Sequence, residues 1–94
     1  MEIDVRGTKV TLRDRLPARD AWPLRQMMVR AQQGEALTFD EEAGALALCV
    51  ESWEFEGDPH DVESYAQLDL ADFAVLDNRV GEYLRSKFTA GSKN

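Results

Sequence analysis

The sequence predicts an α+β fold, a small single domain in which a three-stranded antiparallel sheet packs against three helices. First, residues 2–13 alternate between apolar and polar side chains around Gly7, which is typical of a β-hairpin. Second, apolar residues recur at helical spacing in three later segments. Third, Trp53 and Phe55 alternate with polar residues over 52–56, and this favours a third strand because a lone hairpin is seldom stable.

The first helix is expected over residues 21–33. Asp20 can cap its N-terminus, and Pro23 then falls in the first turn, where a proline is tolerated because the backbone N–H groups have no intrahelical partner. Gly34 is a natural C-terminal stop. One face of this helix is apolar at spacings of three and four residues, through Ala21, Leu24, Met28 and Ala31.

The second helix is expected to begin near Phe39, because Thr38 and Glu41 have the spacing of a capping box. Beyond this helix two interpretations stay open. Trp53 continues the helical stripe, but its alternation with polar neighbours also fits a strand. We expect the strand, and one unbroken helix over 39–56 would remove it.

The last helix has the clearest signals. Asp69 can cap it, and its first turn is acidic while its last turn carries Arg85 and Lys87, as the helix dipole favours. Before it, residues 62–67 fit a short helical turn that follows a Gly-Asp-Pro bend. After it, we expect a small polar tail at about 89–94 to be flexible. The whole chain, 1–94, is expected to be one domain.

The chain is acidic, and its charge is unevenly distributed. Its 94 residues carry a net charge of −7. Residues 1–34 hold seven lysines and arginines against four acidic residues, whereas residues 35–94 hold four against fourteen. We expect no nucleic-acid partner, because binding a phosphate backbone depends on basic side chains, which the acidic part of the chain lacks. We expect no membrane partner, because no run is long and apolar enough to span a bilayer. The split favours a basic partner or a head-to-tail homo-oligomer, although acidic surfaces often serve only solubility.

The residues that could perform chemistry are sparse. Cys49, the single cysteine, lies in an apolar run, which predicts a small buried hydrophobe and not a nucleophile. His60, the single histidine, lies in a loop without metal-ligand spacing. Carboxylates are numerous, but a chain this short rarely encloses the cleft that acid–base catalysis needs. Asp40 to Glu42 are expected at the start of the second helix, where the helix dipole favours negative charge. We therefore expect no enzymatic activity, no cofactor and no metal.

Five residues are candidates for binding a protein partner. Methionine adapts to irregular surfaces, and Met27 is hard to bury beside Met28. Aromatic residues are over-represented at interface hot spots. The alternative is packing in the core, which accounts equally well for Met28 and also for Trp53. The candidates are Trp22, Met27, Met28, Trp53 and Phe55.

Several segments together resemble one known family. Residues 2–19, EIDVRGTKVTLRDRLPAR, form a strand pair that leads into Leu-Pro and the first helix. Residues 50–55, VESWEF, are a tryptophan-containing segment after the second helix. Residues 57–59 with 64–65 provide a turn and a spacer, and residues 68–73, LDLADF, open the last helix. In this order the parts resemble the tail assembly chaperones of long-tailed bacteriophages.

The resemblance implies a non-enzymatic assembly factor in the cytoplasm of an infected or lysogenic bacterial host. Such a protein binds the long, largely helical tape measure protein and keeps it soluble while tail tube protein polymerises around it. In many phages a ribosomal frameshift adds a longer second form. The alternative is a structural head–tail connector or tail completion subunit, which would be retained in finished virions. A small enzyme or metal-dependent regulator would require a bound metal or a well-formed pocket at His60.

Overall fold

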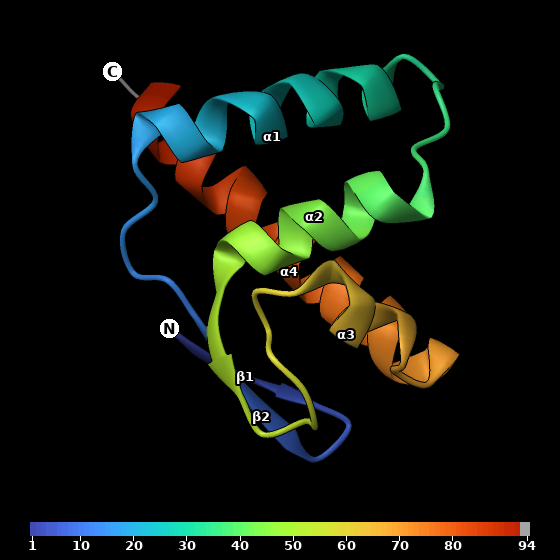
Figure 1. Cartoon of the computed structure of the whole chain (residues 1–94). Helices are drawn as coiled ribbons and strands as arrows, with labels where there is room; N and C mark the ends of the chain where they lie inside the picture. Colours follow the sequence, from blue (N-terminus) through green and yellow to red (C-terminus); the bar gives the residue numbers. More distant parts are fainter. Residues whose placement is uncertain (93–94) are drawn as a thin grey trace.

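The computed structural model describes the backbone of residues 1–92 and the side chains of residues 1–89. The three strands form one antiparallel sheet in the order β1-β2-β3, which lies at one end of the molecule, while α4 runs behind α2 (Figure 1). The predicted α+β fold with its three-stranded sheet is confirmed, but these residues form four helices and not three. The elements are β1 (Glu2–Val5), β2 (Thr8–Leu12), α1 (Ala18–Gln32), α2 (Phe39–Cys49), β3 (Val50–Trp53), α3 (Val62–Ala66) and α4 (Leu70–Ser92).

The sheet buries one of its faces. β1 pairs with β2 so that Ile3 lies opposite Val10, and β2 pairs with β3 so that Val10 lies opposite Trp53. Ile3, Val5, Val10 and Leu12 are all buried. Because successive side chains of a strand point to opposite faces, the predicted alternation places these four residues on the core side.

The third strand begins earlier than the predicted 52–56. α2 passes into β3 without a linker, because its C-cap residue, Val50, already has extended dihedral angles and is fully buried opposite Leu12. The strand ends at Trp53, and the chain then turns through Gly57, whose φ of +90° lies in the left-handed region. The interpretation as a strand is therefore right, and its boundaries are wrong by two or three residues at each end.

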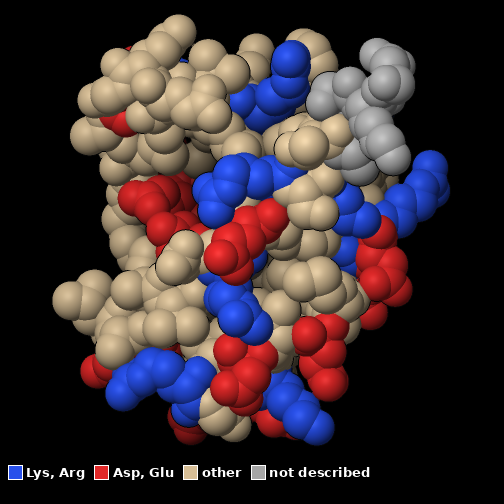
Figure 2. All heavy atoms as spheres, turned by 180° about the vertical axis from the view of Figure 1, so that it is seen from behind, with Lys and Arg blue, Asp and Glu red and all other residues tan. Residues whose placement is uncertain are grey.

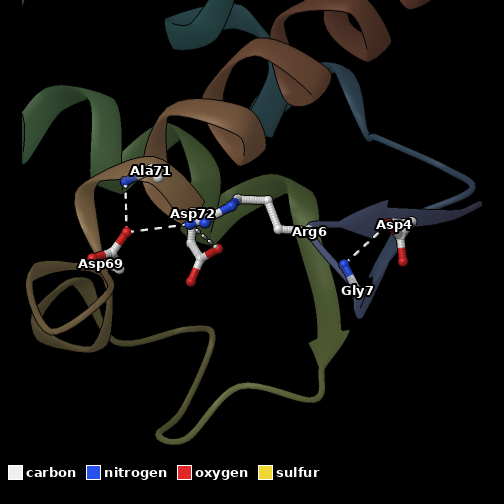
Figure 3. Close-up of polar contacts among 6 residues, drawn as sticks. All are labelled: Asp4, Arg6, Gly7, Asp69, Ala71 and Asp72. Atoms are coloured by element: carbon white, nitrogen blue, oxygen red, sulfur yellow. Dashed lines mark hydrogen bonds and ion pairs between the residues drawn. The ribbon is translucent and has the colours of Figure 1, made fainter.

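A two-residue turn joins β1 to β2 and connects the hairpin to α4 (Figure 3). Arg6 and Gly7 both have positive φ, 51° and 95°, as in the turn type whose twist matches paired strands. The carboxylate of Asp4 accepts a hydrogen bond from the Gly7 N–H at 3.1 Å. From this position the Arg6 guanidinium reaches the carboxylates of Asp69 and Asp72, at 3.3 and 3.2 Å. The hairpin turn is thus tied to the start of α4.

α1 begins three residues before the predicted 21–33. Its first residue is Ala18, and Pro17 is its N-cap, so Asp20 lies inside the first turn and does not cap the helix. The Asp20 carboxylate instead lies 3.4 Å from the Arg13 guanidinium, in the segment that follows β2. A proline preceding the first turn is compatible with helix entry, since its ring fixes φ near the helical value and its missing N–H is not needed there.

Two other predicted helix caps are confirmed. The Thr38 hydroxyl accepts the Glu41 N–H at 3.1 Å, and the Thr38 N–H donates to the Glu41 carboxylate at 2.9 Å, which is the expected capping box. The Asp69 carboxylate accepts the Ala71 N–H at 3.0 Å, at the start of α4. These bonds satisfy backbone donors that a helix leaves free in its first turn.

α4 is longer than the sequence predicts. It continues to Ser92, so residues 89–92 of the expected tail are helical, and residues 93–94 lie outside the described residues. Together with the sheet, α2 and α3, it forms the core. α1 contributes a single fully buried side chain, Leu24. The other buried residues are Ile3, Val5, Val10, Leu12, Ala43, Leu46, Cys49, Val50, Tyr65, Leu76, Val80, Tyr83 and Leu84.

Candidate partner-binding cleft

A cleft of about 280 Å³ opens between α1, α2 and α4. We call it the three-helix cleft. Its apolar lining consists of Leu24, Met27, Met28, Ala31, Leu37, Ala45, Leu46, Val80 and Leu84, with Gly81 between them. Its polar lining consists of Glu42, Asp77, Asn78 and Arg85.

The cleft stays open because small residues face it. Ala31, Ala45 and Gly81 lie where larger side chains would fill the space. A Cβ atom at Gly81 would meet the Arg85 guanidinium at 3.7 Å, so the Arg85 side chain folds back over this glycine. Met27 and Met28 of α1 each lie three or four positions from both Leu24 and Ala31, so the four cleft-lining residues share one helix face. Among them only Leu24 is fully buried, which leaves the α1 wall accessible.

Ion pairs hold both ends of α1. Near its C-terminus, Arg30 donates hydrogen bonds to the carboxylates of Glu35 and Glu41, the latter at 2.7 Å. Near its N-terminus, Asp20 pairs with Arg13. Exposed ion pairs contribute about 0–1 kcal/mol each. The α1 wall of the cleft is thus held by a few weak pairs, one fully buried leucine and the partly buried Met27 and Met28.

Two adjacent glutamates of α2 have opposite electrostatic environments. Hydrogen bonds from Arg30 and from the backbone of Thr38 lower the pKa of the Glu41 carboxyl to about 2. Glu42 lines the cleft, where burial, a hydrogen bond with Asp77 and repulsion by the Asp77 charge raise its pKa to about 7. Glu42 and Asp77 therefore form a carboxyl pair in which Glu42 keeps its proton to a higher pH than a free glutamic acid does.

This carboxyl pair is expected to make stability depend on pH. Because the pKa of Glu42 is higher in the folded chain than its usual 4.5, the folded state binds more protons, and the free energy of unfolding falls as pH rises from 4.5 to about 7. Glu42→Gln should remove this fall and stabilise the protein above pH 7 by about 1 kcal/mol relative to the wild type. Urea unfolding across this pH range measures the effect.

Glu41→Gln should act in the opposite sense. Its lowered pKa stabilises the folded chain above pH 4.5, and this contribution is lost as pH falls toward 2. Glu56→Gln, a change at an exposed position outside the cleft, is the control and should alter neither slope. If the wild type and Glu42→Gln lose stability equally between pH 4.5 and 7, the carboxyl pair does not exist in solution.

Of the five predicted partner-binding residues, two lie in the cleft. Met27 and Met28 are partly buried and line its α1 wall. Trp22 is 55% exposed, and the Arg25 guanidinium lies 5.3 Å from its ring centroid. Residues five positions apart on a helix point in directions about 140° apart, so Trp22 and Met27 do not share a face. A partner role for Trp22 would require a second surface.

Trp53 and Phe55 lie together elsewhere, in an aromatic cluster with Tyr65. The Trp53 ring centroid is 5.4 Å from that of Phe55 and 4.8 Å from that of Tyr65. Trp53 Nε1 donates to the Gly57 carbonyl at 2.9 Å, and the Tyr65 hydroxyl donates to the Pro59 carbonyl at 2.7 Å. These contacts fix the loop between β3 and α3. They give Trp53 a structural role, and its role in partner binding stays a prediction.

From the sequence, Glu42 is explained as a favourable charge at the start of a helix, and its place in the lining of a cleft is not predicted. Glu42 precedes Ala45 by three residues and Leu46 by four, so helical spacing puts it on the inner face of α2. Asp77 likewise precedes Val80 by three residues and Gly81 by four, on α4. An acidic residue within an apolar stripe is the signal that could identify such a pair.

The folded chain mixes the two charge blocks that the sequence separates. Figure 2 shows basic and acidic side chains interleaved over one face of the molecule. Arg6, from the basic block, pairs with Asp69 and Asp72, and Arg30 pairs with Glu35 and Glu41. Part of the basic charge is therefore neutralised within the chain. A homo-oligomer stays a prediction, but the uneven charge along the sequence no longer supports a head-to-tail contact between copies.

The single cysteine and the single histidine do not line the cleft. Cys49 is fully buried, as predicted, and burial raises its thiol pKa to about 12. His60 is exposed, with Nδ1 3.5 Å from the Asp58 carboxylate. Within residues 1–92, no three His, Cys, Asp or Glu side chains are placed to hold a metal ion. No helix in the described part of the chain has the length and apolarity of a membrane span.

No family model, curated protein or solved structure matches this chain.

Proposed function

We propose that this chain is a non-enzymatic tail assembly chaperone of a long-tailed bacteriophage, and that it binds the tape measure protein in the three-helix cleft. The observation that carries the proposal is the cleft, which is open and largely apolar and has two adjacent methionines in one wall. Grooves of this kind receive the apolar face of an amphipathic helix. Methionine side chains adapt to different partners. The family resemblance supplies the client, which is long and largely helical.

The physical properties of the chain suit such a role. A helical client exposes an apolar stripe until the tail tube encloses it, and covering that stripe prevents aggregation. The net charge of −7 makes copies of the chaperone, and the complexes that contain it, repel one another, which keeps them in solution. Because α1 is weakly held, its wall of the cleft can adjust to successive client segments. Tail tube protein would then displace the chaperone as it assembles around the client in the bacterial cytoplasm.

Co-expression tests the proposal directly. The chain should raise the soluble yield of the tape measure protein of the same phage several-fold. Met27→Glu places a charge in the apolar wall of the cleft and should abolish the gain. Val29→Glu is the matched control, since Val29 is on the same helix, is 43% exposed and does not line the cleft. The control should act like the wild type.

Two outcomes would contradict the proposal. If Met27→Glu solubilises the client as well as the wild type does, the cleft is not the client site. If mature virions contain the chain at a fixed stoichiometry, it is a structural subunit. That result would favour the alternative of a head–tail connector or tail completion protein.

A further inference from the structure

The three-helix cleft contains two acids without a basic partner. Glu42 from α2 and Asp77 from α4 meet in it, with apolar side chains around them. Among the described residues, no arginine or lysine lies within ion-pair distance of either carboxyl. The cation that lines the cleft, Arg85, lies against Gly81. Two charged residues of α1 are adjacent in sequence to cleft-lining positions. Arg30 is engaged by two other glutamates, and the Arg25 guanidinium lies 5.3 Å from the Trp22 ring centroid.

We propose that the Glu42–Asp77 pair receives a lysine or arginine side chain of a docked helix, so that the three-helix cleft selects cationic amphipathic helices. This inference rests on the proposed function and names the chemistry of the client. A cation between two carboxylates forms charge-assisted hydrogen bonds, which are stronger than neutral ones. An uncharged side chain would leave the two acids facing each other, and an acidic one would add a third negative charge.

The apolar lining of the cleft fits the rest of such a client. Lysine and arginine carry long apolar stems, which can lie along Met27 and Leu84 while the charged end reaches the carboxyl pair. Leucine-like residues three and four positions away would pack against Met28 and Leu24. Binding thus combines apolar burial with one central charge pairing.

Docking of a cation should also release a proton. The pKa of Glu42 is raised to about 7, so near neutral pH the Glu42 carboxyl is protonated for much of the time. When an ammonium or guanidinium group binds, the Glu42 carboxyl loses this proton to the buffer and the carboxylate pairs with the cation. The other cleft-lining groups that face the pair are Asn78 and Arg85 of α4, while α1 contributes only apolar side chains.

Two synthetic peptides test the inference. Each is an amphipathic helix of about 20 residues, and they differ at one position beside the apolar stripe, which is lysine in one and norleucine in the other. Near neutral pH, the wild-type protein should bind the lysine peptide about tenfold more tightly. The double variant Glu42→Gln, Asp77→Asn should bind both peptides equally. The control Glu51→Gln, Glu82→Gln changes the net charge by the same amount at exposed positions outside the cleft and should keep the preference.

Equal binding of the two peptides to the wild type would overturn the inference. A lysine preference that survives in the double variant would also overturn it, and so would the failure of both peptides to bind. Calorimetry in buffers of different ionisation enthalpy should detect proton release only with the lysine peptide and an intact carboxyl pair. The inference and the proposed function can fail separately. If co-expression raises the soluble yield of the client but the lysine peptide is not preferred, the chaperone role stands and this inference fails. If the lysine peptide is preferred but co-expression does not raise that yield, only the chaperone role fails.

Discussion

Tyr65→Ala is expected to lower the free energy of unfolding by about 3–5 kcal/mol, enough to unfold much of a domain of this size. Tyr65 is 1% exposed, and its ring packs against Trp53 with 4.8 Å between centroids. Truncation removes this packing and leaves a cavity between α3, β3 and the core. It also removes the hydroxyl that donates to the Pro59 carbonyl. Urea unfolding followed by tryptophan fluorescence measures the loss.

Tyr65→Phe is the matched control. It keeps the ring and removes only the hydrogen bond, so it should cost about 1 kcal/mol. A similar cost for Tyr65→Ala and Tyr65→Phe would show that the ring adds little, and the aromatic cluster would then lose its structural role.

Leu24→Ala is expected to lower the free energy of unfolding by about 3 kcal/mol and to release α1 before the rest of the chain. Leu24 is 2% exposed and is the single residue of α1 that is fully buried. The ion pairs at Arg30 and Asp20 cannot replace it, because partly exposed pairs contribute little. Hydrogen exchange should show loss of protection in α1 while β2 and α4 stay protected.

Val29→Ala also truncates a branched apolar side chain to alanine, but on the exposed face of the same helix, and should cost less than about 0.5 kcal/mol. Equal loss of protection in α1 and in the sheet of the Leu24→Ala protein would contradict the account, since it would make α1 part of one cooperative unit. Such a result would also remove the argument that the α1 wall of the cleft can adjust to a client.

The fold follows from the sequence where a local pattern has one interpretation. The alternation around Gly7 and the Thr38–Glu41 capping box predict the hairpin and the start of α2, and both are confirmed. The boundary at Val50 could not be predicted. Val50 belongs to the apolar stripe of α2 and to the buried face of β3 at once, and its pairing opposite Leu12 is a tertiary contact.

The candidate site could be predicted only in part. Met27 and Met28 lie in the cleft. Helical spacing puts Met28, and not Trp22, on the predicted apolar face of α1, but it cannot tell that this face forms one wall of an open cleft. The pairing of Glu42 with Asp77 joins two helices that are far apart in sequence. Each acid can be recognised within its own apolar stripe, whereas their meeting depends on how α2 crosses α4.

Methyl spectra of the methionines test the central claim most directly. The chain has three, and two of them, Met27 and Met28, line the cleft, whereas the Met1 amino group bonds to Leu12 and Asp14 outside it. With methyl-labelled methionine, adding the tape measure protein should shift or broaden the Met27 and Met28 resonances and leave that of Met1 unchanged. A complex that forms while both cleft resonances stay in place would contradict the account.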